Sequence, residues 1–109
     1  MQRSALMTCQ VIFEFRVKEA CIEKLARWLR EILPDTRGYE GCLTLSVTQN
    51  QDEPTSFAVI EQWETRAQYE KYLQWRTESG VLGAMTDMME GEPSFRFFDY
   101  LHVERTACA

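Results

Sequence analysis

The sequence predicts an α+β domain of the ferredoxin-like class, with a four-stranded antiparallel sheet and two helices on one face. The predicted elements follow the order strand, helix, strand, strand, helix, strand, which is the split βαβ pattern. Strand segments alternate apolar and polar residues, whereas helix segments repeat apolar residues every three to four positions. The 109 residues, 45% of them hydrophobic, suffice for a single domain over residues 1–109 with a packed core.

The first two elements are a strand over residues 8–18 and a helix over residues 19–33. Apolar side chains stand at alternate positions of the strand. The helix has an apolar stripe that includes Trp28, and core packing is the first interpretation of that residue. Pro34 lacks a backbone N–H and disfavours helical geometry in the preceding residue, so the helix is predicted to end at Leu33.

Two further strands are predicted over residues 42–49 and 57–63, and the turn-rich segment 50–54 between them indicates a hairpin. Side chains two positions apart in a strand point to the same side. Glu61 and Trp63 are therefore expected on one face of the third strand.

The second helix is predicted to begin after Thr65, because Thr65 and Gln68 form a capping box. Its spacing places Tyr69, Tyr72 and Trp75 on one side. An aromatic stripe of this kind usually belongs to the core. Two interpretations therefore stay open: ordinary core packing, or the wall of a pocket between this helix and the third strand.

The last elements are a short helix from Val81 that includes Met85, Met88 and Met89, and a strand over residues 94–104. The methionines are expected to fill the core, since their side chains adapt to irregular gaps. His102, the one histidine of the chain, falls on this strand. A lone histidine is more often a structural residue than a catalyst.

The strands carry apolar residues on both sides, as Ile12, Ile60 and Phe98 show. One layer of two helices covers only one face of a sheet, and an uncovered apolar face favours association with a partner. We therefore expect a homodimer joined through the open sheet faces.

Composition excludes several classes of protein. The net charge is −5 without a basic stripe, which disfavours nucleic acid as a partner. No apolar run reaches the roughly 18 residues of a membrane span, and the first residues do not resemble a signal peptide. The cysteines form no C-x-x-C pair, so neither a metal site nor a disulfide scaffold is expected and a reducing cytoplasm fits. They are Cys9, Cys21, Cys42 and Cys108.

Glu61 is the best-placed candidate for acid–base chemistry, since neither a glycine-rich phosphate loop nor a nucleophile–histidine set can be assembled. Desolvation beside Trp63 would raise the pKa of this carboxyl group toward the range of a general base. The alternative is a structural salt bridge between Glu61 and an arginine such as Arg76.

Four segments together resemble the antibiotic biosynthesis monooxygenase family over about residues 8–103: LPDTRGYEGC, QDEP, FAVIEQW and YLQWRTESG. The resemblance implies a dimeric α+β barrel. It also implies activities that include cofactor-free oxygenation of anthrones and quinols, heme breakdown, and processing of small signalling molecules. Heme-degrading members have an Asn, a Trp and a His where Phe13, Tyr72 and approximately Thr86 stand here, which disfavours heme breakdown.

A cofactor-independent monooxygenase acting on a small aromatic substrate is the function that this resemblance and these residues favour. The expected catalytic residues are Glu61, Trp63 and Tyr72. The expected substrate-binding residues are Trp28, Tyr69 and Arg76, with Arg76 facing a phenolate. No cofactor or metal is expected. The pocket is expected to admit a flat ring. A cavity of about 300 Å³ or more, with polar groups converging on it, would support ligand binding, whereas a space filled by the chain's own side chains would count against the monooxygenase.

Two alternatives stay open beside the monooxygenase. One is a non-enzymatic domain that binds a small aromatic ligand in the same cavity. The other is an isomerase or degradative enzyme for a small signalling molecule, in which Glu61 moves a proton.

Overall fold

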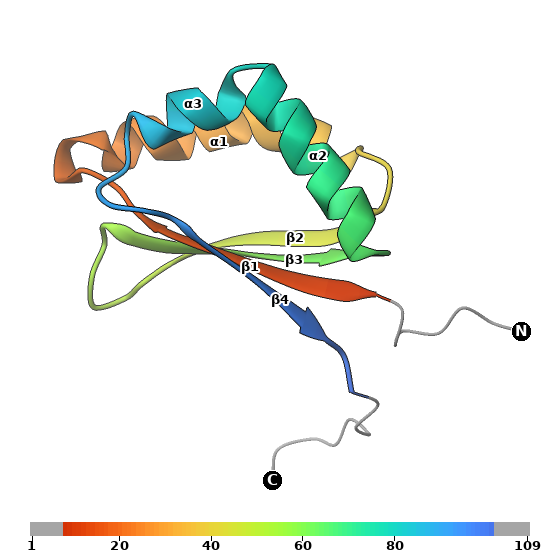
Figure 1. Ribbon diagram of the computed structural model, residues 1–109. Helices are drawn as coiled ribbons and strands as arrows, with labels where there is room; N and C mark the ends of the chain where they lie inside the picture. The colour runs from red at the N-terminus through yellow and green to blue at the C-terminus, as the bar shows by residue number, and fades with distance from the viewer. Residues whose placement is uncertain (1–7, 102–109) are drawn as a thin grey trace, which may run out of the picture.

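The computed structural model describes residues 8–101. The elements run in the order β1 (Cys9–Arg16), the 3-10 turn η2 (Glu19–Cys21), α1 (Ile22–Arg37), β2 (Cys42–Gln49), β3 (Ser56–Trp63), α2 (Arg66–Glu78), α3 (Val81–Thr86) and β4 (Ser94–Asp99). The strands form one antiparallel sheet in the order β2-β3-β1-β4. All three α-helices lie over one face of this sheet (Figure 1). The predicted α+β, ferredoxin-like fold is confirmed.

The sheet register places Glu61 and Trp63 of β3 between two neighbouring strands. Trp63 lies opposite Cys9 of β1 and Cys42 of β2, while Glu61 lies opposite Val11 and Leu45. Both side chains are buried, as are the other residues of β3 that share their face. The predicted common face of Glu61 and Trp63 is therefore the face that the helices cover.

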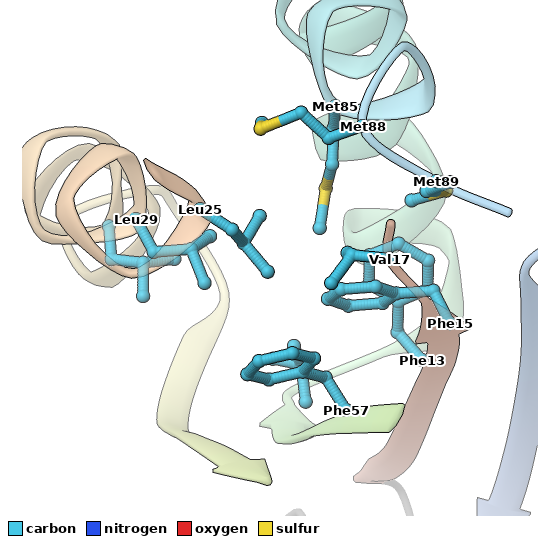
Figure 2. Packing of buried hydrophobic residues seen from close by; sticks show 11 residues of the cluster. Phe13, Phe15, Val17, Leu25, Leu29, Phe57, Met85, Met88 and Met89 are labelled. Carbon is cyan, nitrogen blue, oxygen red and sulfur yellow. The ribbon is translucent and has the colours of Figure 1, made fainter. Parts of the chain in front are cut away.

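Within residues 8–101, two clusters of buried side chains make up the core. The larger one lies between β1, β3, α1 and the segment after α2, and Figure 2 shows its phenylalanines facing leucines of α1 and the methionines. The three methionines are buried, which confirms their predicted role as core filler. The smaller cluster comprises Cys9, Val11, Trp63, Tyr69 and Tyr72.

The predicted helix end at Leu33 is wrong, because α1 continues through Pro34 to Arg37. A proline inside a helix removes one backbone hydrogen bond and costs about 3 kcal/mol. The last turn nevertheless holds Thr36, which is 1% exposed and whose hydroxyl is hydrogen-bonded to side chains of α2. These contacts between helices offset the cost of the proline.

Three other boundaries differ from the prediction. β1 ends at Arg16, and Val17 forms only an isolated bridge with Met89. The short helix ends at Thr86, before the last two methionines. The final strand ends at Asp99. The predicted continuation of that strand and His102 lie outside the described residues.

The sheet face opposite the helices is uncovered within residues 8–101. Ile60 and Phe98 are 37% and 41% exposed on it, and Ile12 of β1, which lies opposite Ile60, is half-buried. Arg96 pairs with Glu14 on the same strands. Across this part of the chain, no helix is both long and apolar enough to cross a bilayer. The cysteines at positions 9, 21 and 42 are free thiols, and Cys108 lies outside the described residues.

Candidate functional site

A small cavity lies between the helical layer and the sheet, beside Glu61. Its volume is about 50 Å³. Its walls are almost entirely apolar and come from β1, β2, β3 and all three α-helices. The polar residues that line it are Glu61, Tyr69, Tyr72 and Arg76.

Glu61 is buried within this cavity wall without an ion-pair partner among residues 8–101. The residue is 4% exposed, and the indole N–H of Trp63 donates a hydrogen bond of 3.0 Å to Glu61 Oε1. Burial raises the pKa of Glu61 from its ordinary value of 4.5 to about 7, and the hydrogen bond from Trp63 opposes that shift. The salt bridge between Glu61 and an arginine, the alternative from the sequence, is not formed.

The start of α2 is fixed by the Thr65 cap, one half of the capping box that the sequence predicts. Thr65 Oγ1 accepts a hydrogen bond of 3.1 Å from the backbone N–H of Gln68. Gly41 packs against the Gln68 side chain so closely, at a φ of 99°, that a Cβ would lie 2.7 Å from it. The Gly41 carbonyl accepts from the Glu64 N–H. These contacts fix the turn between β3 and α2, and so place the tyrosines of α2 beside Trp63.

Trp63 lies at the centre of an aromatic group. Its ring centroid is 5.4 Å from that of Tyr69 and 5.1 Å from that of Tyr72. Tyr39, from the loop before β2, lies 6.2 Å from Trp63 and stacks on Trp75 at 5.4 Å. The sequence did not indicate Tyr39, because an aromatic residue in an irregular loop has no periodicity to reveal its direction.

A hydrogen-bond network joins α2 to the last turn of α1. Tyr72 Oη lies 2.7 Å from Thr36 Oγ1 and accepts from Arg76 Nε at 3.0 Å. Arg76 Nη2 donates to Thr36 Oγ1 at 2.9 Å and to the Ile32 carbonyl at 2.7 Å. Thr36 escaped the sequence prediction because the helix was expected to end before it.

Both tyrosines of the cavity are hydrogen-bonding groups rather than bases. Burial raises the pKa of Tyr69, and the nearby Glu61 and Tyr72 raise it further. Burial also raises the pKa of Tyr72, against the opposing effects of Thr36 and Arg76. Phenols with raised pKa values stay protonated near neutrality. Glu61 is thus the cavity-lining group that gains or loses a proton near neutral pH.

The structure brings four of the six predicted site residues to the cavity wall: Glu61, Tyr69, Tyr72 and Arg76. Trp63 is fully buried behind the wall and reaches the cavity only through its hydrogen bond to Glu61. Trp28 is half-buried and packs against the larger core cluster, away from the cavity lining.

The cavity is much smaller than the roughly 300 Å³ that would support binding of a flat ligand. A volume of about 50 Å³ accommodates a few water molecules rather than a flat polycyclic ring. Leucine and methionine side chains of the helices, among them Leu73, Leu82 and Met85, line the cavity and limit its volume. A ring-shaped ligand therefore requires these side chains to move.

Fold and site together define a class of protein: a small ferredoxin-like α+β domain with a buried carboxyl group facing an apolar cavity between sheet and helices. The family model for antibiotic biosynthesis monooxygenases matches residues 9–79. The chain belongs to this family, as its sequence motifs indicated.

Solved structures share the fold at low sequence identity. A conserved protein from Methanosarcina mazei has a TM-score of 0.79 at 14% identity, covering 87% of this chain and 94% of that one. A structure described as an antibiotic biosynthesis monooxygenase has a TM-score of 0.77 at 20% sequence identity, covering 85% of this chain and 98% of that one. A structure from Nitrosomonas europaea, provisionally given the same name, has a TM-score of 0.74 at 20% sequence identity, covering 88% of this chain and 92% of that one. A comparison with curated proteins found no match.

Proposed function

We propose that this chain is a cofactor-independent monooxygenase that acts on a small aromatic, quinol-like substrate, with Glu61 as the general base. The observation that carries the proposal is the buried Glu61 carboxyl group, whose pKa of about 7 suits proton transfer near neutrality, on the wall of an apolar cavity. Membership of the monooxygenase family supports the reaction type. Because the cavity is small, a single ring suits it better than the three rings of an anthrone.

In the proposed reaction, the substrate supplies its own electrons. Glu61 removes the acidic proton of the quinol, and the resulting anion gives an electron to O₂. A carbon–oxygen bond then forms at the ring carbon beside the phenolate, yielding a hydroperoxide. Loss of water breaks the O–O bond and leaves a new carbonyl, so that two hydrogens are replaced by one oxygen. The proton taken by Glu61 leaves with the water.

The remaining residues of the cavity bind and orient the substrate anion. Tyr69 and Tyr72 present aromatic faces and protonated hydroxyls, which stack on a ring and donate hydrogen bonds. Arg76 supplies a permanent positive charge on the same wall. The apolar walls exclude water, which strengthens each of these electrostatic interactions.

Oxygen consumption by the pure protein tests the proposal. A set of monocyclic quinols is offered without flavin or metal, and uptake of O₂ with formation of the hydroxyquinone is the expected result. Binding of these quinols without oxygen uptake would instead favour the alternative of a ligand-binding domain. Absence of both would contradict the proposal.

Leu82→Ala is expected to raise the affinity for a single-ring quinol, because this side chain of α3 lines the cavity and is only half-buried. The loss of stability should be small, about 1 kcal/mol. Equilibrium titration and urea unfolding measure the two effects. Leu101→Ala removes a leucine that is 78% exposed and serves as the matched control. Equal affinity in Leu82→Ala and the native protein would contradict this location of the binding site.

Trp63→Phe should move the acid limb of the kcat/KM profile to higher pH. The indole N–H stabilises the charged form of Glu61, so its removal lets burial raise the pKa of that carboxyl group above 7. Activity at pH 7 should fall, while activity at higher pH is largely kept. An unchanged profile in Trp63→Phe, together with unchanged turnover in Tyr72→Phe, would refute the assigned site.

We also propose that two copies associate through the uncovered sheet face. Its apolar side chains include Ile60 and Phe98, which are 37% and 41% exposed in the single chain. Burying such a patch is a common reason for association. Sedimentation velocity at micromolar concentration should give the mass of a dimer, and a monomer there would count against this interface.

A further inference from the structure

Arg76 is a buried positive charge without a negative partner in the part of the chain that the structure describes. The residue is 5% exposed. The three ion pairs found within residues 8–101 involve Arg16, Arg66 and Arg96, all at exposed positions. Buried charges in proteins are normally paired, because the loss of hydration is otherwise uncompensated. The burial of Arg76 therefore requires an explanation.

The neighbours of the guanidinium account for part of its stabilisation. Its Nε and Nη2 atoms donate to Tyr72 Oη, Thr36 Oγ1 and the Ile32 carbonyl, which are all neutral acceptors. The last two lie near the C-terminus of α1, where the helix carries about half a negative elementary charge. The Cζ atom also lies 4.6 Å from the centroid of the Trp75 ring. None of these neighbours supplies a full negative charge.

The second terminal nitrogen, Nη1, donates to no acceptor within residues 8–101, whereas Nε and Nη2 are both occupied. No side-chain nitrogen or oxygen that is sealed from solvent lacks a partner in this part of the chain, so Nη1 is accessible to water or to a ligand. Arg76 lines the same cavity as Glu61. The planar fork of a guanidinium matches the two oxygens of a carboxylate. An anion in the cavity would supply the missing charge and replace water as the acceptor for Nη1.

We propose that Arg76 is the binding site for a carboxylate that the substrate carries before any reaction. The guanidinium is charged at all times, whereas a phenolate exists only after a proton has been removed. A permanent buried cation is therefore matched by a permanent anion. The substrate class that follows is a small aromatic acid, with its carboxylate at Arg76 and its acidic hydroxyl toward Glu61.

This inference deepens the proposed function and rests on it only in taking the cavity as the place of reaction. Its test uses benzoate and benzamide, which have nearly the same shape, differ in charge and lack the hydroxyl that the reaction needs. Affinities are measured by isothermal titration calorimetry, so oxygen chemistry does not enter. The native protein should bind benzoate about tenfold more tightly than benzamide.

Three variants locate the effect. Arg76→Gln should abolish the preference for benzoate. Arg76→Lys keeps the positive charge and should retain part of the preference. The Lys variant provides the test if Arg76→Gln does not fold. Arg66→Gln removes an exposed arginine from the same helix and should leave the preference unchanged.

Equal affinity of the native protein for the two probes, or binding of neither, would overturn the inference. So would a preference that survives in folded Arg76→Gln, or one that Arg76→Lys retains in full. These outcomes leave the oxygenation test with neutral quinols untouched. Conversely, a preference for benzoate without any oxygen uptake would sustain the carboxylate site and refute the proposed reaction.

Discussion

Glu61→Gln is expected to lower kcat/KM for oxygen-dependent turnover by about 10²- to 10⁴-fold, the contribution that a positioned general base typically makes. The amide has nearly the same shape as the carboxyl group and can still accept the hydrogen bond from Trp63 Nε1. It cannot take a proton from the substrate. Steady-state oxygen uptake at several pH values measures the effect.

The matched control is Glu70→Gln, which changes an exposed glutamate on α2 that pairs with Arg66. It should leave turnover unchanged, because its carboxylate is far more exposed than that of Glu61 and does not line the cavity. Binding of a quinol to Glu61→Gln should persist, since the aromatic walls are intact. Native-like turnover in this variant would remove Glu61 from the mechanism.

The free energy of unfolding should fall by about 3 kcal/mol between pH 4.5 and 7 because of Glu61 alone. The pKa of this group is about 7 in the folded chain and near 4.5 when unfolded. Between these values the folded state holds a proton that the unfolded state has released. Raising the pH therefore favours unfolding across this window, and the stabilisation is complete only below pH 4.5.

Urea unfolding across this pH range, in the native chain and in Glu61→Gln, isolates the contribution of this residue. Other carboxyl groups titrate in both proteins, so the difference between the two curves belongs to Glu61. The variant should be the more stable of the two above pH 7, since it buries no charge. Parallel curves would show that the pKa of Glu61 is not raised by folding.

The fold was largely predictable because local and long-range preferences agree along most of the chain. Alternation in residues 42–49 and 57–63, with a turn between them, defines a hairpin that the structure contains. The Thr65 cap marks the start of α2. The failure at Pro34 has a physical origin: a contact between helices, made by Thr36, outweighs the local preference against proline. The local sequence around Pro34 does not reveal such a contact between helices.

The site was predictable in part. Strand periodicity placed Glu61 on the face of Trp63, and helical periodicity placed Tyr69 and Tyr72 opposite them. Two further features had no local signal: the hydrogen-bond acceptors around Arg76 and the volume of the cavity. The first depends on the packing of α1 against α2. The second depends on how far the side chains of α3 reach into the space between the layers.

The pKa of Glu61 in the folded chain is the quantity on which the whole account depends. It can be measured directly by following the ¹³C shift of the Glu61 side-chain carboxyl carbon by NMR as the pH is raised, with Glu61→Gln to assign the signal. A midpoint near 7 is expected from the burial of the group. A midpoint near 4.5, the ordinary value for glutamate, would show a solvated carboxylate and contradict the proposed base.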